Sequence, residues 1–247
     1  MAFWSRFVVS GLTTFLIFGC SNWAESTRQD SKRVVQETNV ARLLTQASEI
    51  KQIEDLFIQG NELLKANRYQ DAIVAYDKIV MAAPNNVEAW INRGNAYSAL
   101  QRYGQALGSY DRAIAIQPKR DEAWYNRGNA LSAMRLDQEA VKSYDKAIAI
   151  KADKYEAWIN RGIALTKLQR YSQALASYDK AIAIKPDKHQ AYYNKACTYA
   201  LQKNTIAAIS NLQKAMKLVP GKYEKLAKTD PDFVKIRNNK QFQNLVN

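Results

Sequence analysis

Histidine and cysteine, which often perform catalysis or bind metals, are scarce in this sequence. The chain of 247 residues has one histidine, His189, and two cysteines, Cys20 and Cys197. Two cysteines cannot form a disulfide framework, and one histidine leaves little room for a histidine-based catalytic or metal site. The sequence also lacks the common phosphate-loop, dinucleotide, paired-cysteine and zinc-protease motifs. We therefore expect no enzymatic activity, no metal, no cofactor and no small-molecule substrate.

The sequence around Cys20 indicates a covalent modification. A short start with one positive charge, Arg6, precedes a mostly apolar run at residues 7–18, which is too short to span a bilayer comfortably as a helix. Residues 17–21 read Ile-Phe-Gly-Cys-Ser. This resembles a bacterial lipoprotein signal, which implies a signal peptide at residues 1–19 and lipid attached to Cys20. The protein would then be extracytoplasmic, anchored at the periplasmic face of the inner or outer membrane.

Two alternatives to lipidation remain open. An ordinary cleaved signal would give a secreted or periplasmic soluble protein, and an uncleaved segment would act as an anchor.

A second set of side chains could bind a partner. An acidic residue, an aliphatic or aromatic residue and two asparagines recur at spacings i, i+3, i+4 and i+7, which share one face of a helix. An asparagine side chain both donates and accepts hydrogen bonds, so a row of them can pair with the backbone of an extended peptide. The candidate peptide-binding residues are Asn61, Glu88, Ile91, Asn92, Asn95, Glu122, Tyr125, Asn126, Asn129, Glu156, Ile159, Asn160, Tyr193 and Asn194.

The character of these residues suggests a ligand preference. The aliphatic and aromatic positions would form side-chain pockets. The acidic row of Glu54, Glu88, Glu122 and Glu156 would favour Lys or Arg in the ligand. The alternative is that the asparagines only satisfy hydrogen bonds between helices.

These residues recur because the chain repeats every 34 residues. The period is marked by Gly60, Gly94, Gly128 and Gly162, by Trp90, Trp124 and Trp158, by Tyr76, Tyr110, Tyr144 and Tyr178, and by Pro84, Pro118, Pro186 and Pro220. A proline cannot continue a helix, so each unit ends there. The spacing predicts two helices per unit, such as residues 87–100 and 103–116, and units must stack because none can bury its apolar face alone.

The unit reads W-x-x-x-G-x-x-[YL], then A-x-x-x-Y, then P, and it resembles the tetratricopeptide repeat. We expect five units at residues 53–86, 87–120, 121–154, 155–188 and 189–222. The resemblance implies an all-α fold, a right-handed α-solenoid with helical caps, in which the candidate peptide-binding residues face a concave groove. The Lys and Arg that clamp a terminal carboxylate in co-chaperone members are replaced here by Phe57, Glu122 and Asn126.

One departure from the repeat pattern predicts ion pairs. Arg93, Arg127 and Arg161 stand where the pattern has leucine. We expect them to pair with the repeat acids Asp77, Asp111, Asp145 and Asp179.

The ends of the chain need separate elements. Residues 20–33 are polar and predict a flexible tether, and residues 34–52 predict an amphipathic N-terminal helix. Residues 223–247 predict capping helices, because Asp230-Pro231-Asp232 is typical of a helix start.

Charge adds little to the functional prediction. The formal net charge is +13, but Lys and Arg are spread along the chain, which favours solubility over a nucleic-acid partner. The sequence predicts a membrane-anchored interaction scaffold or adaptor of the bacterial envelope that binds other proteins or extended peptide segments. The alternative is a structural, self-associating envelope protein without a peptide ligand. The oligomeric state is not predicted.

The Cys20 prediction can be tested directly. Replacing Cys20 with Ser removes the sulfur that would carry the lipid, so we expect the protein to move from the membrane to the soluble fraction. Immunoblots of fractionated cells measure this. Continued membrane retention of the Cys20→Ser variant would show that the lipid is not the anchor.

Overall fold

The computed structural model describes residues 9–247, with side chains from residue 27 onward. Within this range the regular structure is helical throughout. The chain divides into two compact units, and the boundary between them in the sequence lies between Asp55 and Leu56. The predicted signal peptide begins outside the described residues, and the side chain of Cys20 also lies outside them.

The first unit consists of most of helix α1 (Val9–Lys65). The predicted flexible tether at residues 20–33 is helical in the structure, and the predicted helix at 34–52 is part of the same element. The physical reason is that residues 20–59 contain no glycine or proline to end a helix. Within the described residues, none of the helices is long and apolar enough to cross a membrane.

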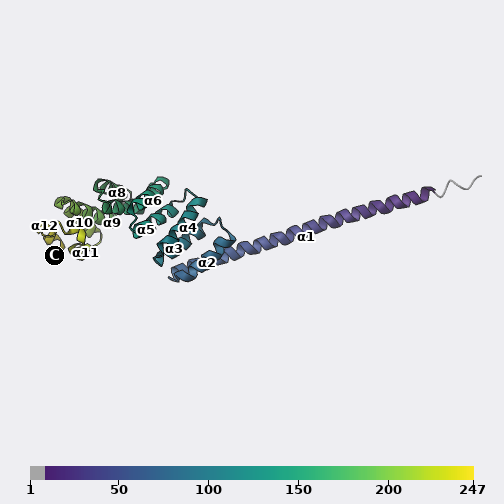
Figure 1. Cartoon of the computed structure of the whole chain (residues 1–247), viewed down its shortest axis with the longest axis horizontal. Coiled ribbons are helices and arrows are strands. Elements are labelled where there is room, and N and C mark those ends of the chain that lie inside the picture. The colour runs from purple at the N-terminus through teal and green to yellow at the C-terminus, as the bar shows by residue number, and fades with distance from the viewer. Residues whose placement is uncertain (1–8) are drawn as a thin grey trace, which may run out of the picture. The chain divides into compact units, whose positions relative to one another are not determined.

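The second unit is a series of helix pairs (Figure 1). The last residues of α1 pair with α2, and four further pairs follow, so the five predicted units are present. Their helices are α2 (Tyr69–Ala82), α3 (Val87–Ala99), α4 (Tyr103–Ile116), α5 (Asp121–Ala133), α6 (Asp137–Ile150), α7 (Tyr155–Lys167), α8 (Tyr171–Ile184), α9 (His189–Leu201) and α10 (Thr205–Leu218). Each helix packs on its neighbours in sequence, which confirms the all-α solenoid.

The turn inside each unit has one defined backbone conformation. Asn67, Gln101, Arg135, Gln169 and Lys203 have φ between 59° and 63°. In the second unit of the repeat, Arg102 N–H donates to the Tyr97 carbonyl and Gln101 N–H to the Ser98 carbonyl, both at 2.9 Å. These two bonds close the end of α3 as a Schellman motif. The turn therefore reverses the chain sharply without a glycine.

A close contact sets the distance between the two helices of a unit. Tyr76, Tyr110, Tyr144 and Tyr178 are fully buried, and each ring lies against the repeat glycine of the preceding helix. A Cβ atom added to Gly128 would lie only 2.6 Å from Cε1 of Tyr144. No other residue type fits there without moving the ring.

Arginines join each unit to the next, as predicted. Each donates from Nε to an aspartate of the previous unit and from Nη1 to a buried serine of its own unit. The pairs are Arg93 with Asp77 (2.6 Å) and Ser109 (3.0 Å), Arg127 with Asp111 (2.7 Å) and Ser143 (2.8 Å), and Arg161 with Asp145 and Ser177 (both 2.6 Å). Asp179 is paired instead with Lys195. The arginine side chains are only 21–27% exposed. These contacts therefore orient the helices of neighbouring units and contribute to the stability of the stack.

The C-terminal cap has three short helices, α11 (Tyr223–Thr229), η1 (Pro231–Phe233) and α12 (Lys240–Val246). Asp230 caps η1 by accepting from the Asp232 N–H at 3.0 Å, as the sequence predicted. Phe233 and Phe242 are buried and stack on each other with ring centroids 5.3 Å apart. The cap thereby covers the apolar end of α9 and α10.

Two helical glycines, Gly128 and Gly108, should change the stability of the protein in opposite directions when each is replaced with alanine. Gly128→Ala pushes against the buried Tyr144 ring and should lower the unfolding free energy by about 1–3 kcal/mol. Gly108→Ala on α4 meets nothing within 4 Å and should raise it by about 0.5–1 kcal/mol through helix propensity. Urea unfolding followed by circular dichroism measures both. Equal shifts of the two variants would contradict the tight glycine–tyrosine contact.

Candidate functional site

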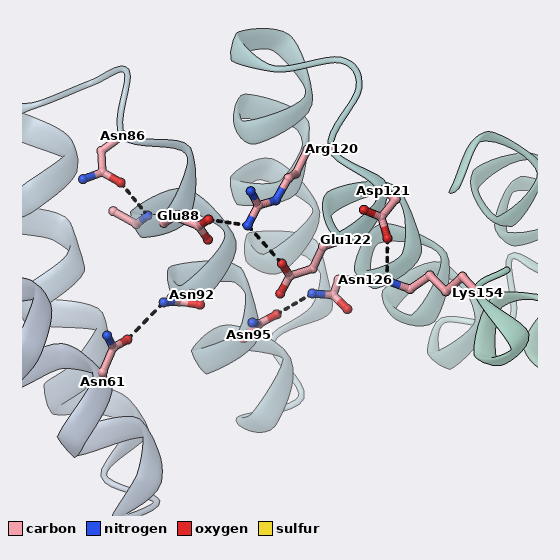
Figure 2. Close-up of polar contacts among 11 residues, drawn as sticks. Asn61, Asn86, Glu88, Asn92, Asn95, Arg120, Asp121, Glu122, Asn126 and Lys154 are labelled. Carbon is pink, nitrogen blue, oxygen red and sulfur yellow. Dashed lines mark hydrogen bonds and ion pairs between the residues drawn. The ribbon is translucent and has the colours of Figure 1, made fainter. Parts of the chain in front are cut away.

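Asparagines of neighbouring first helices bond to one another. In each case the later residue donates from Nδ2 to Oδ1 of an asparagine 31 residues earlier. The three rungs are Asn92 to Asn61 (3.1 Å), Asn126 to Asn95 (3.0 Å) and Asn160 to Asn129 (2.9 Å). Figure 2 shows the first two of these, which we call, with the third, the asparagine ladder.

Each accepting asparagine also receives a tyrosine hydroxyl. The donors are Tyr76 to Asn61 (2.8 Å), Tyr110 to Asn95 (2.9 Å) and Tyr144 to Asn129 (2.9 Å). Burial raises the pKa of Tyr110 to about 12, so its hydroxyl stays protonated and can donate at neutral pH. The ladder therefore contributes to the packing of the solenoid. This agrees with the alternative interpretation from the sequence, that the asparagines satisfy hydrogen bonds between helices.

The ladder does not use the full bonding capacity of its amides. In each rung the accepting asparagine keeps its Nδ2 hydrogens, and the donating asparagine keeps its Oδ1, without a partner among the described residues. These side chains are half-buried, so the groups are reachable. A donor and an acceptor side by side complement the C=O and N–H groups of a peptide backbone.

The ladder ends at the fourth unit. Ile163 stands where the earlier units have an accepting asparagine, so Asn194 donates to the Gln190 carbonyl of its own helix at 2.9 Å. Thr166 replaces the missing amide by bonding to the hydroxyls of Tyr178 (3.3 Å) and Thr198 (2.8 Å). The predicted row therefore holds for three units, and Asn194 is not part of the ladder. The change to isoleucine is visible in the sequence and signals this end.

The predicted row of aliphatic and aromatic pockets is largely wrong. Ile91 and Ile159 are only 0% and 7% exposed, because this helical position points at the next unit and not into the groove. They pack on alanines of the following helices. Tyr193 is 7% exposed because the cap covers it. Tyr125 remains half-exposed, and its hydroxyl accepts from Asn160 at 3.2 Å.

The acidic row is partly neutralised by cations that the sequence analysis missed. Arg120 contacts Glu88 and lies 3.4 Å from Glu122, as Figure 2 shows. Lys154 bonds to Asp121 at 2.8 Å. Burial opposes ionisation of Asp121, but Lys154 outweighs it and holds the pKa of that carboxyl below its usual value. Arg120 and Lys154 each directly precede the first helix of a unit and are 34 residues apart. This spacing could have predicted a cation near the acidic row. The groove therefore offers less acidity to a ligand than expected.

A hollow of about 940 Å³ lies between the starts of α5 and α7. Its wall includes Tyr125, Asn126, Tyr155, Arg120 and Lys154. Lys154 Nζ lies 4.9 Å from the ring centroid of Tyr125. Aromatic, amide and charged groups thus meet at one place in the groove.

Cys197 and His189 are held in the cap region. Burial, with the neighbouring Asp230 carboxylate, raises the pKa of the Cys197 thiol, so the thiol is protonated. His189 contacts the Tyr223 hydroxyl, and burial with Lys222 and Lys188 lowers its pKa. At neutral pH both side chains are uncharged.

Helix pairs of fixed length, with a glycine–tyrosine contact in the first four pairs and asparagines that bond from unit to unit, define a helical-repeat protein. Family models for the tetratricopeptide repeat match residues 59–121, 91–155, 155–188 and 189–221. The chain belongs to the tetratricopeptide repeat family.

Solved structures share the fold. A crystal structure of MamA has 27% sequence identity and a TM-score of 0.62, covering 68% of this chain and 96% of that chain. MamA from Desulfovibrio magneticus RS-1 has 16% identity and a TM-score of 0.64, covering 68% and 94%. YrrB, a TPR protein with an unusual peptide-binding site, has 23% identity and a TM-score of 0.58, covering 66% and 84%. Comparison with curated proteins gives no significant match.

The thiol of Cys197 should be slow to react. Because its pKa is raised, the reactive thiolate stays scarce, and alkylation should not accelerate between pH 7 and pH 9 as it does for a free cysteine. Mass spectrometry of the Cys20→Ser variant treated with iodoacetamide measures the rate, with the same protein in urea as control. Rapid labelling of the folded protein that rises with pH would contradict the buried, protonated thiol.

Proposed function

We propose that this protein is an interaction scaffold that holds extended peptide segments of partner proteins in the groove of its repeats. The observation that carries the proposal is the spare donor and acceptor on each rung of the asparagine ladder. These groups can bind a peptide backbone whatever its side chains are. YrrB, which shares the fold, has a peptide-binding site. For this chain the proposal rests on the hydrogen-bonding groups of its own asparagines.

The open part of the groove runs over the first four units. At the fifth unit the cap segment lies on α9 and buries Tyr193 and Cys197. The same cap covers the apolar end of the solenoid with Phe233 and Phe242, which disfavours end-to-end stacking there. This observation supports ligand binding over self-assembly as the main role.

The basic excess is partly used inside the fold. Arg93, Arg120, Arg127, Arg161, Lys154 and Lys195 are engaged in ion pairs with acids of the solenoid. This supports a protein partner over nucleic acid, because a nucleic-acid surface needs free cations gathered on one face.

We also propose that the scaffold is a lipoprotein with its signal peptide at residues 1–19 and its lipid on Cys20. The Ile-Phe-Gly-Cys-Ser sequence at residues 17–21 supports this proposal. Two or more acyl chains give a stable anchor where a single chain does not. Partners would then be envelope proteins on the same side of the membrane.

The groove proposal is tested by removing the ladder amides. The triple variant Asn92→Ala, Asn126→Ala and Asn160→Ala loses the spare acceptors, and we expect recovery of partners from solubilised membranes to fall about tenfold or more. Affinity capture with quantitative mass spectrometry measures recovery against the parent protein.

A matched control separates binding from stability. Arg161→Ala breaks the contacts to Asp145 and Ser177 and loosens the same stack without touching the ladder. It should lower the melting temperature but keep its partners. Unchanged recovery with the triple variant, or an equal loss with Arg161→Ala, would rule out the ladder as the binding surface.

A further inference from the structure

The part of helix α1 that precedes the solenoid is exposed over its whole described length. Every residue from 27 to 52 is helical, and every one of them is exposed to solvent. In proteins, most of the stability of a helix comes from packing its apolar face against another element. An exposed helix of this length that has an apolar face therefore presents a surface for a partner.

One face of this exposed segment is apolar. Val40, Leu43, Leu44, Ala47 and Ile50 recur at spacings i, i+3, i+4, i+7 and i+10, which place them on one side of a helix. The four larger side chains are 50–67% exposed. We call these five residues the α1 stripe. The opposite face between residues 38 and 52 is polar and consists of Thr38, Arg42, Thr45, Glu49 and Gln52.

The surface of α1 is hollowed beside the stripe. A hollow of about 450 Å³ is lined by Val40 and Leu44, together with Gln36 and Ala41. When two helices pair, a side chain of one helix inserts into a space of this kind between residues of the other. The shape of the stripe, as well as its apolar character, therefore suits a second helix.

The charges that flank the stripe complement each other. Glu37 stands seven residues before Leu44, and Lys51 stands seven residues after it. Seven residues are about two turns, so both charges lie along the same side of the helix as Leu44. Two antiparallel helices that cross at Leu44 bring each Glu37 level with the partner's Lys51. In a parallel pair in register, each charge would instead lie level with its like charge, which is unfavourable.

We propose that the α1 stripe binds the α1 stripe of a second copy of this chain, antiparallel and centred on Leu44. The apolar side chains of the two stripes bury one another. Glu37 contacts Arg33 of its own helix at 3.0 Å, and its exposed carboxylate can also bond the partner's Lys51. This dimer uses neither the residues of the groove nor the capped end of the solenoid, so the inference does not rest on the proposed function.

The charge balance of the segment favours a second copy over a lipid surface. Residues 27–55 contain five Lys or Arg and five Asp or Glu. A helix that lies on a membrane usually has a basic polar face, which attracts anionic lipids. The balanced charges of this segment provide no such attraction but allow pairing between copies.

Cross-linking in intact cells tests the geometry. The probe is a short bismaleimide, applied to the full chain carrying Cys20→Ser and an added cysteine. Cys197 is only 4% exposed, and the chain without an added cysteine gives the background. We expect Leu44→Cys to give a strong dimer band on a denaturing gel. Glu37→Cys alone should give a much weaker band, because its two copies lie about 21 Å apart, and adding Lys51→Cys should restore the band.

Further substitutions in the Leu44→Cys chain test the forces. Leu43→Asp puts a charge into the stripe and should lower the dimer yield about fivefold or more. Thr45→Asp puts the same charge on the opposite face, also one residue from the cross-link, and is the matched control that should keep the yield. Glu37→Lys should lower the yield, and combining it with Lys51→Glu should restore it, because opposite charges then face each other again.

Two cross-linking results would overturn the antiparallel dimer. One is the absence of a dimer band with Leu44→Cys, and the other is an equal band with Glu37→Cys alone. An equal loss with Leu43→Asp and Thr45→Asp would also overturn it, because the stripe would then not be the contact. If the band is absent and the purified chain floats with phosphatidylglycerol vesicles unless Leu43 is replaced with Asp, the stripe binds lipid instead.

Discussion

The packing of a buried tyrosine ring on a glycine determines how the two helices meet in each of the first four repeats. With the ring in place against Gly94, the Tyr110 hydroxyl reaches the amide oxygen of Asn95. That bond orients Asn95 so that Asn126 of the next unit can donate to it. A contact inside one repeat thus sets the geometry between repeats. The asparagine ladder depends on this chain of contacts, because its amides lie where the tyrosines place them.

The proposed capacity to bind a partner rests on hydrogen-bonding groups that the fold leaves unused. An asparagine amide offers two hydrogens and two lone-pair directions, and the ladder uses only part of them. The same residues therefore stabilise the stack and present peptide-like groups to the groove. Such contacts are indifferent to ligand sequence, so selectivity must come from elsewhere.

Much of the fold was readable from spacing. The predicted helices at 87–100 and 103–116 match α3 and α4 within one residue, and the arginine–aspartate pairs formed as expected. The residues that line the groove were harder to predict from the sequence. Periodicity places Ile91 on the same helical face as Asn92 but does not tell which edge of that face the next unit covers. The tether prediction failed because polar composition does not by itself end a helix that contains no breaker.

The sequence by itself determined the repeat, the number of units and the arginine–aspartate ion pairs between them. These features follow from residue types that recur at a fixed period, because the same helix geometry in every unit places equivalent residues on equivalent faces. Only the tertiary structure decided which asparagine atoms are already bonded, that Arg120 joins two glutamates, and that the tail lies on Tyr193. Those outcomes depend on side chains from different helices meeting in space, and a period along the chain carries no information about the atoms that meet.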